Sequence, residues 1–424
     1  MVYRVATRSW NAPFDAQNLY GDSAVSDCKV MDPAVTPDIE PTLRLLRREL
    51  APALVEMQRQ RATATMPGVR HESVEFYIGD AQFAREQQLF FREMPLVACL
   101  SSELPERGSF RTFADTGVPM LLSRGKDGQV RAFLNICPHR GSRLVRTASG
   151  KASRFTCRFH GWTFDSTGKA VGIPEESYFC GDIDAQKHLV SCPAEERHGL
   201  VFVKTSPGSK IDLDAHLGAL NRDLAVIGLE TAQIVHADTL QVPANWKYGL
   251  DTFFETYHLN SLHRETFRGL FSPVNVFDRF GPHHRYTFAP LNLAKWTEIP
   301  ENDWDVDTIP LQYFLFPNTI ISVGSTSRTG STVNLHQILP SSIGHFASRL
   351  SYCVLGGIRS PEHKAEIDAA YETSRRALIN EDYSVVGESY SGFAALPAGT
   401  RMPIGRQEIG VQNFHRNVAR LLDQ

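Results

Sequence analysis

Long apolar segments are absent from this sequence of 424 residues. No apolar run reaches the roughly 18 residues that a membrane-spanning helix needs. The first residues, MVYRVATRSWNAPFDAQ, lack the apolar core of a signal peptide. Basic residues are not in excess either, because 44 Lys and Arg stand against 47 Asp and Glu, for a net charge of -3. The sequence therefore predicts neither a membrane protein nor a nucleic-acid-binding protein.

Cysteine is sparse, and its count of seven is odd. This usage does not indicate a disulfide framework, so we expect a cytoplasmic, reducing location. Five cysteines have no matching partner and are interpreted as ordinary small residues: Cys28, Cys99, Cys180, Cys192 and Cys353. The other two each stand close to a histidine.

The remaining composition is that of a globular protein, with 42% hydrophobic and 21% charged residues and length for two or more cores. Residues 1–65 begin with turn formers and then predict a helix over 41–61, which Pro52 should interrupt. We assign this N-terminal arm no role. Residues 80–93 also predict a helix. From about 95 to 205, short β-type runs such as PMLLSR, VRAFLNI, RFTC and LVFVKT predict a small all-β domain.

The C-terminal half mixes helical and strand patterns. A helix is expected over about 245–270, followed by strand candidates HRYTFAP, TIISVGS, TVNLHQILP and SRLSYCVLGG. A long helix should begin near Ser360, which can cap it, with Pro361 and Glu362 suited to its first turn. Strands followed by a closing helix predict an α+β domain with an antiparallel sheet.

Two Cys-His pairs lie inside the predicted β domain, in NICPHRGSRL and RFTCRFHGWTF. Cys137 and His139 form the first pair, and Cys157 and His160 form the second. A structural zinc site and a Rieske [2Fe–2S] centre both use two cysteines and two histidines, so the spacing alone leaves both open. The glycines beside the ligands favour the cluster, because tight loops can point backbone N–H groups at sulfur.

A second group of ligand-type residues lies in NWKYGLDTFFETYHLNSLHRETF, residues 245–267. Asp251, Glu255 and His258 are spaced by four and three residues, which on a helix places them on one face within about 60°. The alternative is an amphipathic helix with incidental histidines.

His263 follows His258 by five residues, about 140° around a regular helix. For both to bind one metal, the helix must end or distort between them, and Asn260 and Ser261 suit such a break.

Both segments resemble motifs of the Rieske non-heme iron, aromatic-ring-hydroxylating oxygenases, in the α (large, catalytic) subunit. The first motif is C-P-H-R-G followed by C-x2-H-G-W, and the second is N-W-K-x3-D-x3-E-x2-H-x4-H. The resemblance implies a Rieske [2Fe–2S] domain at 95–205. It also implies a helix-grip (START/Bet v 1-like) catalytic domain built from 66–94 and 206–424. The cluster ligands would be Cys137, His139, Cys157 and His160, and a mononuclear Fe(II) would be held by His258, His263 and a distant carboxylate.

The last long helix supplies that carboxylate. N-E-D-x5-E resembles the family's C-terminal ligand segment and matches Asp382 to the ligand position, with Glu381 as the alternative. On a regular helix Asp382 also falls on one stripe with Ile367, Tyr371, Ser374, Leu378, Val385 and Ser389. A carboxylate on a largely buried face is costly unless it is paired or binds a metal.

The family assembles as a ring of three α subunits, with or without a β subunit (α3 or α3β3), and electrons pass between neighbouring chains. By resemblance, Glu255 would join His160 of one chain to His258 of the next, although the family usually has Asp there. Asp251 stands where many members have Asn, and its charge could couple proton uptake to reduction.

The resemblance implies the terminal oxygenase of a system that hydroxylates or dihydroxylates an aromatic substrate with O2. Electrons would come from an NAD(P)H-linked flavin reductase, a ferredoxin or both, because no dinucleotide fingerprint occurs in the right context. Oxidative O- or N-demethylation is the alternative. An electron carrier and a zinc-stabilised, non-catalytic ligand-binding protein are alternatives of other classes.

Candidate substrate contacts come from aromatic and apolar residues near the iron motif: Phe253, Phe254, Leu259, Phe267, Phe271 and Tyr313. His283 and His284 could contact a substrate carboxylate, with help from Arg285. The competing interpretation is that these are core residues and a strand-edge pair.

Overall fold

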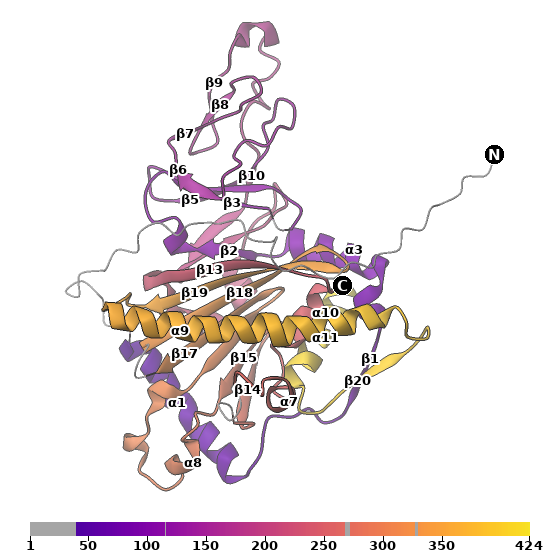
Figure 1. The fold of residues 1–424 in the computed structure, drawn as a ribbon. Coiled ribbons are helices and arrows are strands. Elements are labelled where there is room, and N and C mark those ends of the chain that lie inside the picture. Colours follow the sequence, from indigo (N-terminus) through magenta and orange to yellow (C-terminus); the bar gives the residue numbers. More distant parts are fainter. Residues whose placement is uncertain (1–39, 115, 268–271, 327–329) are drawn as a thin grey trace.

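The fold is described by a computed structural model that covers residues 40–114, 116–267, 272–326 and 330–424. A β-rich head, residues 96–203, projects from one end of a larger body built on a single wide sheet (Figure 1). The two-part α+β architecture expected from the sequence is confirmed. No helix in the described ranges is both long and apolar enough to cross a membrane.

Three small sheets form the head, with strand orders β10-β5-β4-β3-β6, β11-β12-β2 and β7-β8-β9. The strands are β2 (Leu96–Leu100), β3 (Ser109–Phe113), β4 (Met120–Arg124), β5 (Val130–Leu134), β6 (Ser149–Lys151), β7 (Arg154–Thr156), β8 (Thr163–Asp165), β9 (Ala170–Gly172), β10 (Ser191–Cys192), β11 (Ala194–Arg197) and β12 (Leu200–Val203). The four β-type runs identified in the sequence correspond to β4, β5, β7 and β12. The β7-β8-β9 sheet lies in the outer part of the head, and the short helical turn at Glu176–Phe179 lies beyond it (Figure 1).

The body is built on a seven-stranded antiparallel sheet of order β13-β19-β18-β17-β16-β15-β14. Its strands are β13 (Ala232–Val242), β14 (Asn275–Phe280), β15 (His283–Phe288), β16 (Leu311–Leu315), β17 (Thr319–Thr326), β18 (Gly330–Ser342) and β19 (His345–Leu355). The four predicted strand candidates correspond to β15, β17, β18 and β19. The sequence patterns did not single out β13, β14 and β16.

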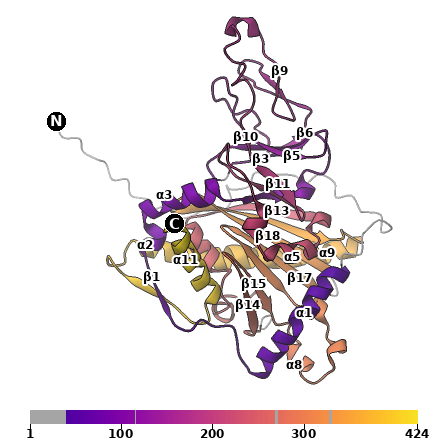
Figure 2. The ribbon, with the colours of Figure 1, turned by 180° about the vertical axis from the view of Figure 1, so that it is seen from behind.

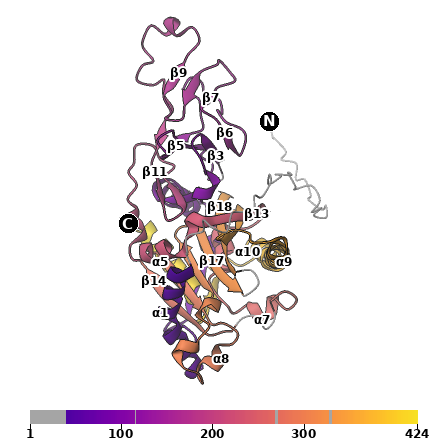
Figure 3. The same ribbon diagram turned by 90° about the vertical axis from the view of Figure 1, so that its left-hand side faces the viewer.

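Helices cover both faces of this sheet, as the edge-on view shows (Figure 3). One face carries α1 (Glu40–Arg59), α5 (Leu220–Ile227) and α8 (Leu293–Trp296). The other carries α9 (Pro361–Ala377) and α10 (Tyr383–Phe393). Tyr313 and Phe314 are neighbours on β16, and both are buried, one in each of the two cores. Alternation along the strands therefore separates residues facing α1 from residues facing α9 and α10.

Short elements close the edges of the body (Figure 2). A two-stranded sheet joins the start and the end of the body through β1 (Arg70–Ser73) and β20 (Arg401–Ile404). The remaining helices are α2 (Glu75–Ile78), α3 (Asp80–Gln88), α4 (Leu213–Leu217), α6 (Trp246–Asp251), α7 (Leu259–Leu262) and α11 (Ile409–Leu422). The predicted helix over 80–93 is confirmed as α3, continued by a π-turn at Leu89–Glu93.

Helix α1 corrects one expectation, because Pro52 does not interrupt it. Pro52 lies on the exposed side, whereas Leu54 and Val55 on the opposite side are buried against the sheet. The backbone bond that proline removes is therefore lost where water can replace it. Burial of each apolar side chain contributes about 1.5–3 kcal/mol, which favours continuing the helix.

The long helix near residue 360 begins as predicted. The Ser360 hydroxyl accepts a hydrogen bond from the backbone N–H of His363 at 3.1 Å, with Pro361 in the first turn. The stripe predicted along this helix is wrong beyond Leu378, because a π-turn over Leu378–Asp382 adds a residue and shifts the phase. Val385, expected on the buried line, is 40% exposed.

Candidate metal centres

The two Cys-His loops share one backbone design. The N–H of Gly141 donates to the carbonyl of Cys137 at 3.0 Å, and the N–H of Gly161 donates to that of Cys157 at 2.9 Å. Both glycines have positive φ, +72° and +75°, which glycine adopts without a steric penalty. The loops thus turn twice in the same way, and each brings its cysteine into the interior of the head.

Backbone N–H groups point at the cysteine sulfurs, as the glycine flanks predicted. Those of His139 and Arg140 approach Cys137, and those of Phe159 and His160 approach Cys157. Burial raises the pKa of the Cys157 thiol, but these donors and its cysteine partner outweigh burial, so the pKa ends below its usual value. The thiolate form that metal coordination requires is therefore favoured at this sulfur.

His139 and His160 face each other beside the cysteines, with ring centroids 4.6 Å apart. The ring of His139 stacks on Trp162 at 5.0 Å and meets the edge of Phe179 at 5.8 Å. Two histidines and two cysteines that accept backbone N–H groups fit a Rieske [2Fe–2S] cluster, in which the two cysteines bind one iron and the two histidines bind the other.

The second motif starts with an anchor. Asn245 caps α6 by accepting a hydrogen bond from the N–H of Lys247 at 3.0 Å. Trp246 and Lys247 both donate to Glu86 on α3, and the Lys247 Nζ lies 2.7 Å from a Glu86 oxygen, with both side chains buried. The N-W-K segment thus holds the start of the motif against the core.

The helix expected over 245–270 is wrong in extent. Helix α6 ends at Asp251, turns follow, and α7 occupies only Leu259–Leu262. Asn260 and Ser261, where we expected the break, lie inside this short helix. The break instead falls before His258, so that His258 precedes α7 and His263 follows it. Both imidazoles can then face the same point without a long helix between them.

His258, His263 and Asp382 come together, with one ligand atom from each within 4.8 Å of the others. Oδ1 of Asp382 lies 3.2 Å from Nε2 of His263 and 3.5 Å from Nε2 of His258. This oxygen is buried and has no hydrogen-bond partner among the residues that the structure describes. An unpartnered buried carboxylate oxygen beside two imidazole nitrogens fits a metal ion held by two histidines and one carboxylate.

Each histidine of this triad uses its other ring nitrogen for a separate carboxylate. Nδ1 of His263 lies 2.6 Å from Oε2 of Glu381, which also accepts from the hydroxyl of Thr266. Nδ1 of His258 contacts Glu255. Carboxylates in this position orient metal-binding imidazoles and fix the ligating nitrogen.

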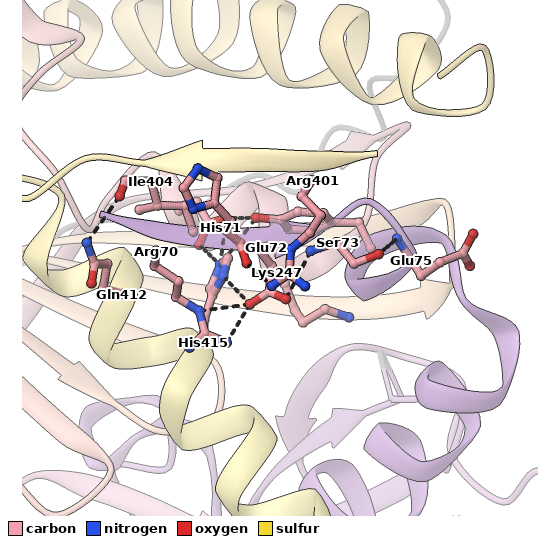
Figure 4. A network of polar contacts seen from close by, with 12 residues as sticks. Arg70, His71, Glu72, Ser73, Glu75, Lys247, Arg401, Ile404, Gln412 and His415 are labelled. Atoms are coloured by element: carbon pink, nitrogen blue, oxygen red, sulfur yellow. Dashed lines mark hydrogen bonds and ion pairs between the residues drawn. The ribbon is translucent and has the colours of Figure 1, made fainter. Parts of the chain in front are cut away.

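Asp251 does not join the triad. Its carboxylate accepts a hydrogen bond from Tyr77 at 2.5 Å and lies 3.1 Å from Nε2 of His415 on α11. Nδ1 of His415 makes an ion-pair contact at 3.3 Å with Glu72, which Arg70 also binds. Figure 4 shows Glu72 on β1 between Arg70 and His415. Asp251 thus belongs to a buried charge network that connects α6 with β1, near the start of the body in the sequence, and with α11, at its C-terminal end.

The predicted substrate residues divide into several environments. Phe254 is fully buried against Phe314 and Phe414. Phe253, Leu259 and Phe267 are partly buried, and the Phe267 ring lies 5.3 Å from that of His263. Phe271 lies outside the described residues.

His283 and His284 are both buried, and burial lowers the pKa of His283 to about 4 and that of His284 to about 3. Both ring nitrogens of His283 bond backbone groups, the carbonyl of His216 at 2.7 Å and the N–H of Phe316 at 2.9 Å. His284 packs among aromatic rings, and within the described part of the chain its two ring nitrogens have no hydrogen-bond partner. Arg285 and Tyr313 lie on the face of the sheet opposite to His284. There Arg285 forms ion pairs with Asp223 and Asp278.

Sequence reasoning missed the partners that orient the site. Glu381 was weighed only as an alternative ligand, and the roles of Tyr77 and His415 had no local signal because both lie far from the motif. Asn334 and His336 on β18, described below, had a weak signal. They are polar residues at alternate positions of the run TVNLHQIL, on either side of the apolar Leu335.

Comparisons with known proteins agree with this geometry. The family model of the ring hydroxylating α subunit (catalytic domain) matches residues 229–424, and that of the Rieske [2Fe–2S] domain matches residues 94–193. The glycine betaine monooxygenase oxygenase subunit of Pseudomonas aeruginosa is 29% identical over 61% of this chain and 58% of its own. The anthranilate 1,2-dioxygenase large subunit of Acinetobacter baylyi is 32% identical over 43% of this chain and 40% of its own.

A solved quaternary ammonium Rieske monooxygenase, CntA, superposes with a TM-score of 0.73 at 20% identity, over 85% of this chain and 99% of its own. This likeness shows the fold. The alignment with the first curated relative spans 58% of that relative's length.

The chain belongs to the Rieske non-heme iron oxygenases, with the domain pair of their large subunits. The Rieske domain of this family binds a [2Fe–2S] cluster, and the catalytic domain binds a mononuclear iron.

Proposed function

We propose that this chain is the terminal oxygenase of a Rieske system and that it oxidises a small organic substrate with O2. The observation that carries the proposal is the convergence of His258, His263 and Asp382 in a chain that also has a complete Cys-His loop pair. When bound, the cluster supplies single electrons and the mononuclear Fe(II) supplies open coordination positions for O2. The electrons would come from a reductase, a ferredoxin or both.

In this proposal Cys137, Cys157, His139 and His160 hold the cluster. The backbone N–H groups aimed at the two sulfurs stabilise negative charge there and tune the reduction potential. His258, His263 and Asp382 hold the iron through two Nε2 atoms and one carboxylate oxygen.

Glu255 has two tasks in the proposal. Its carboxylate contacts Nδ1 of His258 and accepts the backbone N–H of His258 at 3.2 Å, which fixes the imidazole with Nε2 toward the metal position. A carboxylate bridging two histidines would also connect the cluster ligand His160 of one chain to His258 of the next. The two sites of a single chain lie in different parts of the molecule, the cluster loops in the head and the triad in the body (Figure 1). This separation supports electron transfer between chains in a homotrimer, with or without a β subunit.

Two reaction classes share this apparatus. One class is hydroxylation or dihydroxylation of an aromatic ring, and the relative anthranilate 1,2-dioxygenase represents it. The other is oxidation of a methylated amine, and the relative glycine betaine monooxygenase represents it. Identification of products by mass spectrometry separates the two, because one adds oxygen to the substrate and the other releases an oxidised one-carbon fragment.

Metal analysis tests the proposed function directly. Protein purified without oxygen should contain about three irons and two acid-labile sulfides per chain, the sum of one [2Fe–2S] cluster and one mononuclear iron. Asp382→Ala should lose about one iron and product formation while keeping the cluster absorption spectrum.

Glu388→Ala is the matched control, since Glu388 is an exposed carboxylate on α10. It should keep all metals and activity. Zinc in place of iron and sulfide, or undiminished turnover by Asp382→Ala, would contradict the proposal.

A further inference from the structure

Polar side chains line the centre of the wide sheet, on the face toward α9 and α10. Gln312, Ser322 and Asn334 are cross-strand neighbours on β16, β17 and β18. The same face presents the buried apolar residues Phe314 and Ile320, which pack in the core shared with α9 and α10. All three polar residues remain partly exposed although their strands lie inside the sheet. The helical cover is therefore incomplete above this row.

His336 lies two residues after Asn334 on β18 and faces the same way. The residue is 8% exposed, yet its Nδ1 is buried without a hydrogen-bond partner among the described residues, and the amide of Asn334 is half-buried on the same face. Burial lowers the pKa of His336 to about 4, so the ring is neutral at physiological pH. A buried polar group without a partner costs free energy, and such groups in proteins usually await a water molecule or a ligand.

These polar residues are connected to the iron motif. The Phe253 ring lies 5.0 Å from the ring of His336, and the Phe253 carbonyl accepts a hydrogen bond from Gln312 at 2.5 Å. On the other side, Tyr383 directly follows Asp382 and donates to the Ser348 hydroxyl at 2.7 Å, and Ser348 pairs with Ile338 on β18. His336 thus lies on the sheet between the segment that carries His258 and the turn that carries Asp382.

Charge is missing from this part of the sheet. Strands β16, β17 and β18 contain no Asp, Glu, Lys or Arg within their described bounds. A charged ligand group placed against them would lose hydration without a counter-ion, whereas an uncharged oxygen can exchange hydrogen bonds with an imidazole and an amide. Apolar contact beside these groups comes from the Phe253 ring and from Ile320, which pairs with His336 across β17 and β18.

We propose that Asn334 and His336 form the polar end of the substrate site and that they select an uncharged ring compound bearing a hydroxyl, methoxy or carbonyl group. This inference rests on the proposed function for the location of the reaction. It excludes, as the preferred ligand, both a betaine and an unsubstituted hydrocarbon.

Binding to iron-loaded protein under nitrogen tests this proposal without turnover. Isothermal titration would compare 4-ethylphenol with ethylbenzene, which lacks only the hydroxyl, and with glycine betaine. We expect 4-ethylphenol to bind at least tenfold more tightly than either of the others. Equal or tighter binding of glycine betaine or ethylbenzene would overturn the assignment.

The variant His336→Phe keeps a planar ring and removes both nitrogens. It should weaken 4-ethylphenol binding about tenfold, the effect of one lost buried hydrogen bond, and leave ethylbenzene binding unchanged or improved. His345→Phe is the control, because His345 is exposed at the start of β19. If His336→Phe does not fold, Asn334→Leu tests the neighbouring contact. Unchanged 4-ethylphenol binding in a folded variant would overturn the proposal.

The two proposals fail in different ways. Protein with the full iron and sulfide content that prefers glycine betaine would refute the substrate assignment and leave the oxygenase function intact. Protein that prefers 4-ethylphenol but lacks cluster and iron would refute the oxygenase function instead.

Discussion

At the scale of single residues, the metal-site histidines divide their two nitrogens between different carboxylates. Nε2 of His258 and of His263 faces Asp382, whereas the Nδ1 atoms face Glu255 and Glu381 respectively. An Nδ1–H donated to a carboxylate leaves Nε2 as the free lone pair and makes it more basic. Glu381, which the sequence motif offers as an alternative ligand, contacts His263, and we propose that it acts through this histidine.

Glu381→Gln tests that role. The amide should still reach His263 and Thr266 but without a negative charge, so Fe(II) affinity should fall about 10- to 100-fold. Anaerobic Fe(II) titration of the apo-iron protein measures the change. The exposed Glu388→Gln should have no effect. An unchanged affinity in Glu381→Gln would show that His263 needs no charged partner.

His415 balances the buried network around Asp251. Arg70 and Lys247 contribute two positive charges there, and Glu72, Glu86 and Asp251 contribute three negative charges. Burial lowers the pKa of His415, but Asp251 and Glu72 outweigh burial and raise it above the usual value. Protonated His415 therefore offsets the excess negative charge of these five side chains, and removing the partner of a buried charge is destabilising.

This raised pKa predicts a pH-dependent stability difference. The His415 contribution is fully present below the unfolded pKa of about 6.5 and is lost as pH rises through the higher folded value. The stability lost in His415→Gln relative to the native protein should therefore be largest near pH 6 and smaller near pH 9. Urea unfolding at both pH values measures it. A difference that grows with pH would contradict a protonated His415.

At the scale of elements, the helix from Pro361 to Phe393 sets the position of Asp382. Its start is fixed by the Ser360 cap, and its phase changes in the π-turn at Leu378–Asp382. Glu381 and Asp382 are consecutive, yet both reach the triad. A wider turn presents adjacent side chains to one region, which explains why a π-turn suits this ligand segment.

Ser360→Ala should remove the cap and lower the free energy of unfolding by about 1 kcal/mol. Iron content per folded chain should not change, because the cap lies at the opposite end of α9 from Asp382. Urea unfolding measures the loss, and Ser360→Asp, which retains a capping oxygen, should recover most of it. A loss in Ser360→Asp as large as in Ser360→Ala would argue against capping as the cause.

At the scale of the whole molecule, the two candidate metal sites of one chain lie apart, with the cluster loops in the head and the triad in the body (Figure 1). Electron transfer between them would have to cross the head and part of the body. In the proposed trimer, the cluster in the head of one chain would instead supply electrons to the iron in the body of the next, so an isolated chain would not turn over.

Mixing of two inactive variants tests this arrangement. His139→Cys should impair the cluster, and Asp382→Ala should remove the iron, so each variant alone should be inactive. Co-expressed chains with different tags, purified as mixed oligomers, should recover a measurable fraction of activity because an intact cluster can meet an intact iron site. Mixed oligomers with no recovered activity would contradict electron transfer between chains.

Local patterns in the sequence determined the chemistry and much of the fold. The Cys-His spacing with its glycines, the alternating strands β15, β17, β18 and β19, and the cap at Ser360 depend on neighbouring residues. Steric and hydrogen-bonding rules of the backbone therefore suffice to predict them.

Only the tertiary structure decided how distant residues meet. Packing against other elements, not local propensity, explains three features. These are the early end of α6, the π-turn that ends at Asp382, and the continuation of α1 through Pro52. The contacts of Tyr77 and His415 with Asp251, and of Glu381 with His263, also depend on the tertiary structure, because these residues are far apart in the sequence. A buried charge in a low-dielectric interior needs a partner, and that partner can come from any part of the chain. A short segment of sequence therefore cannot predict it.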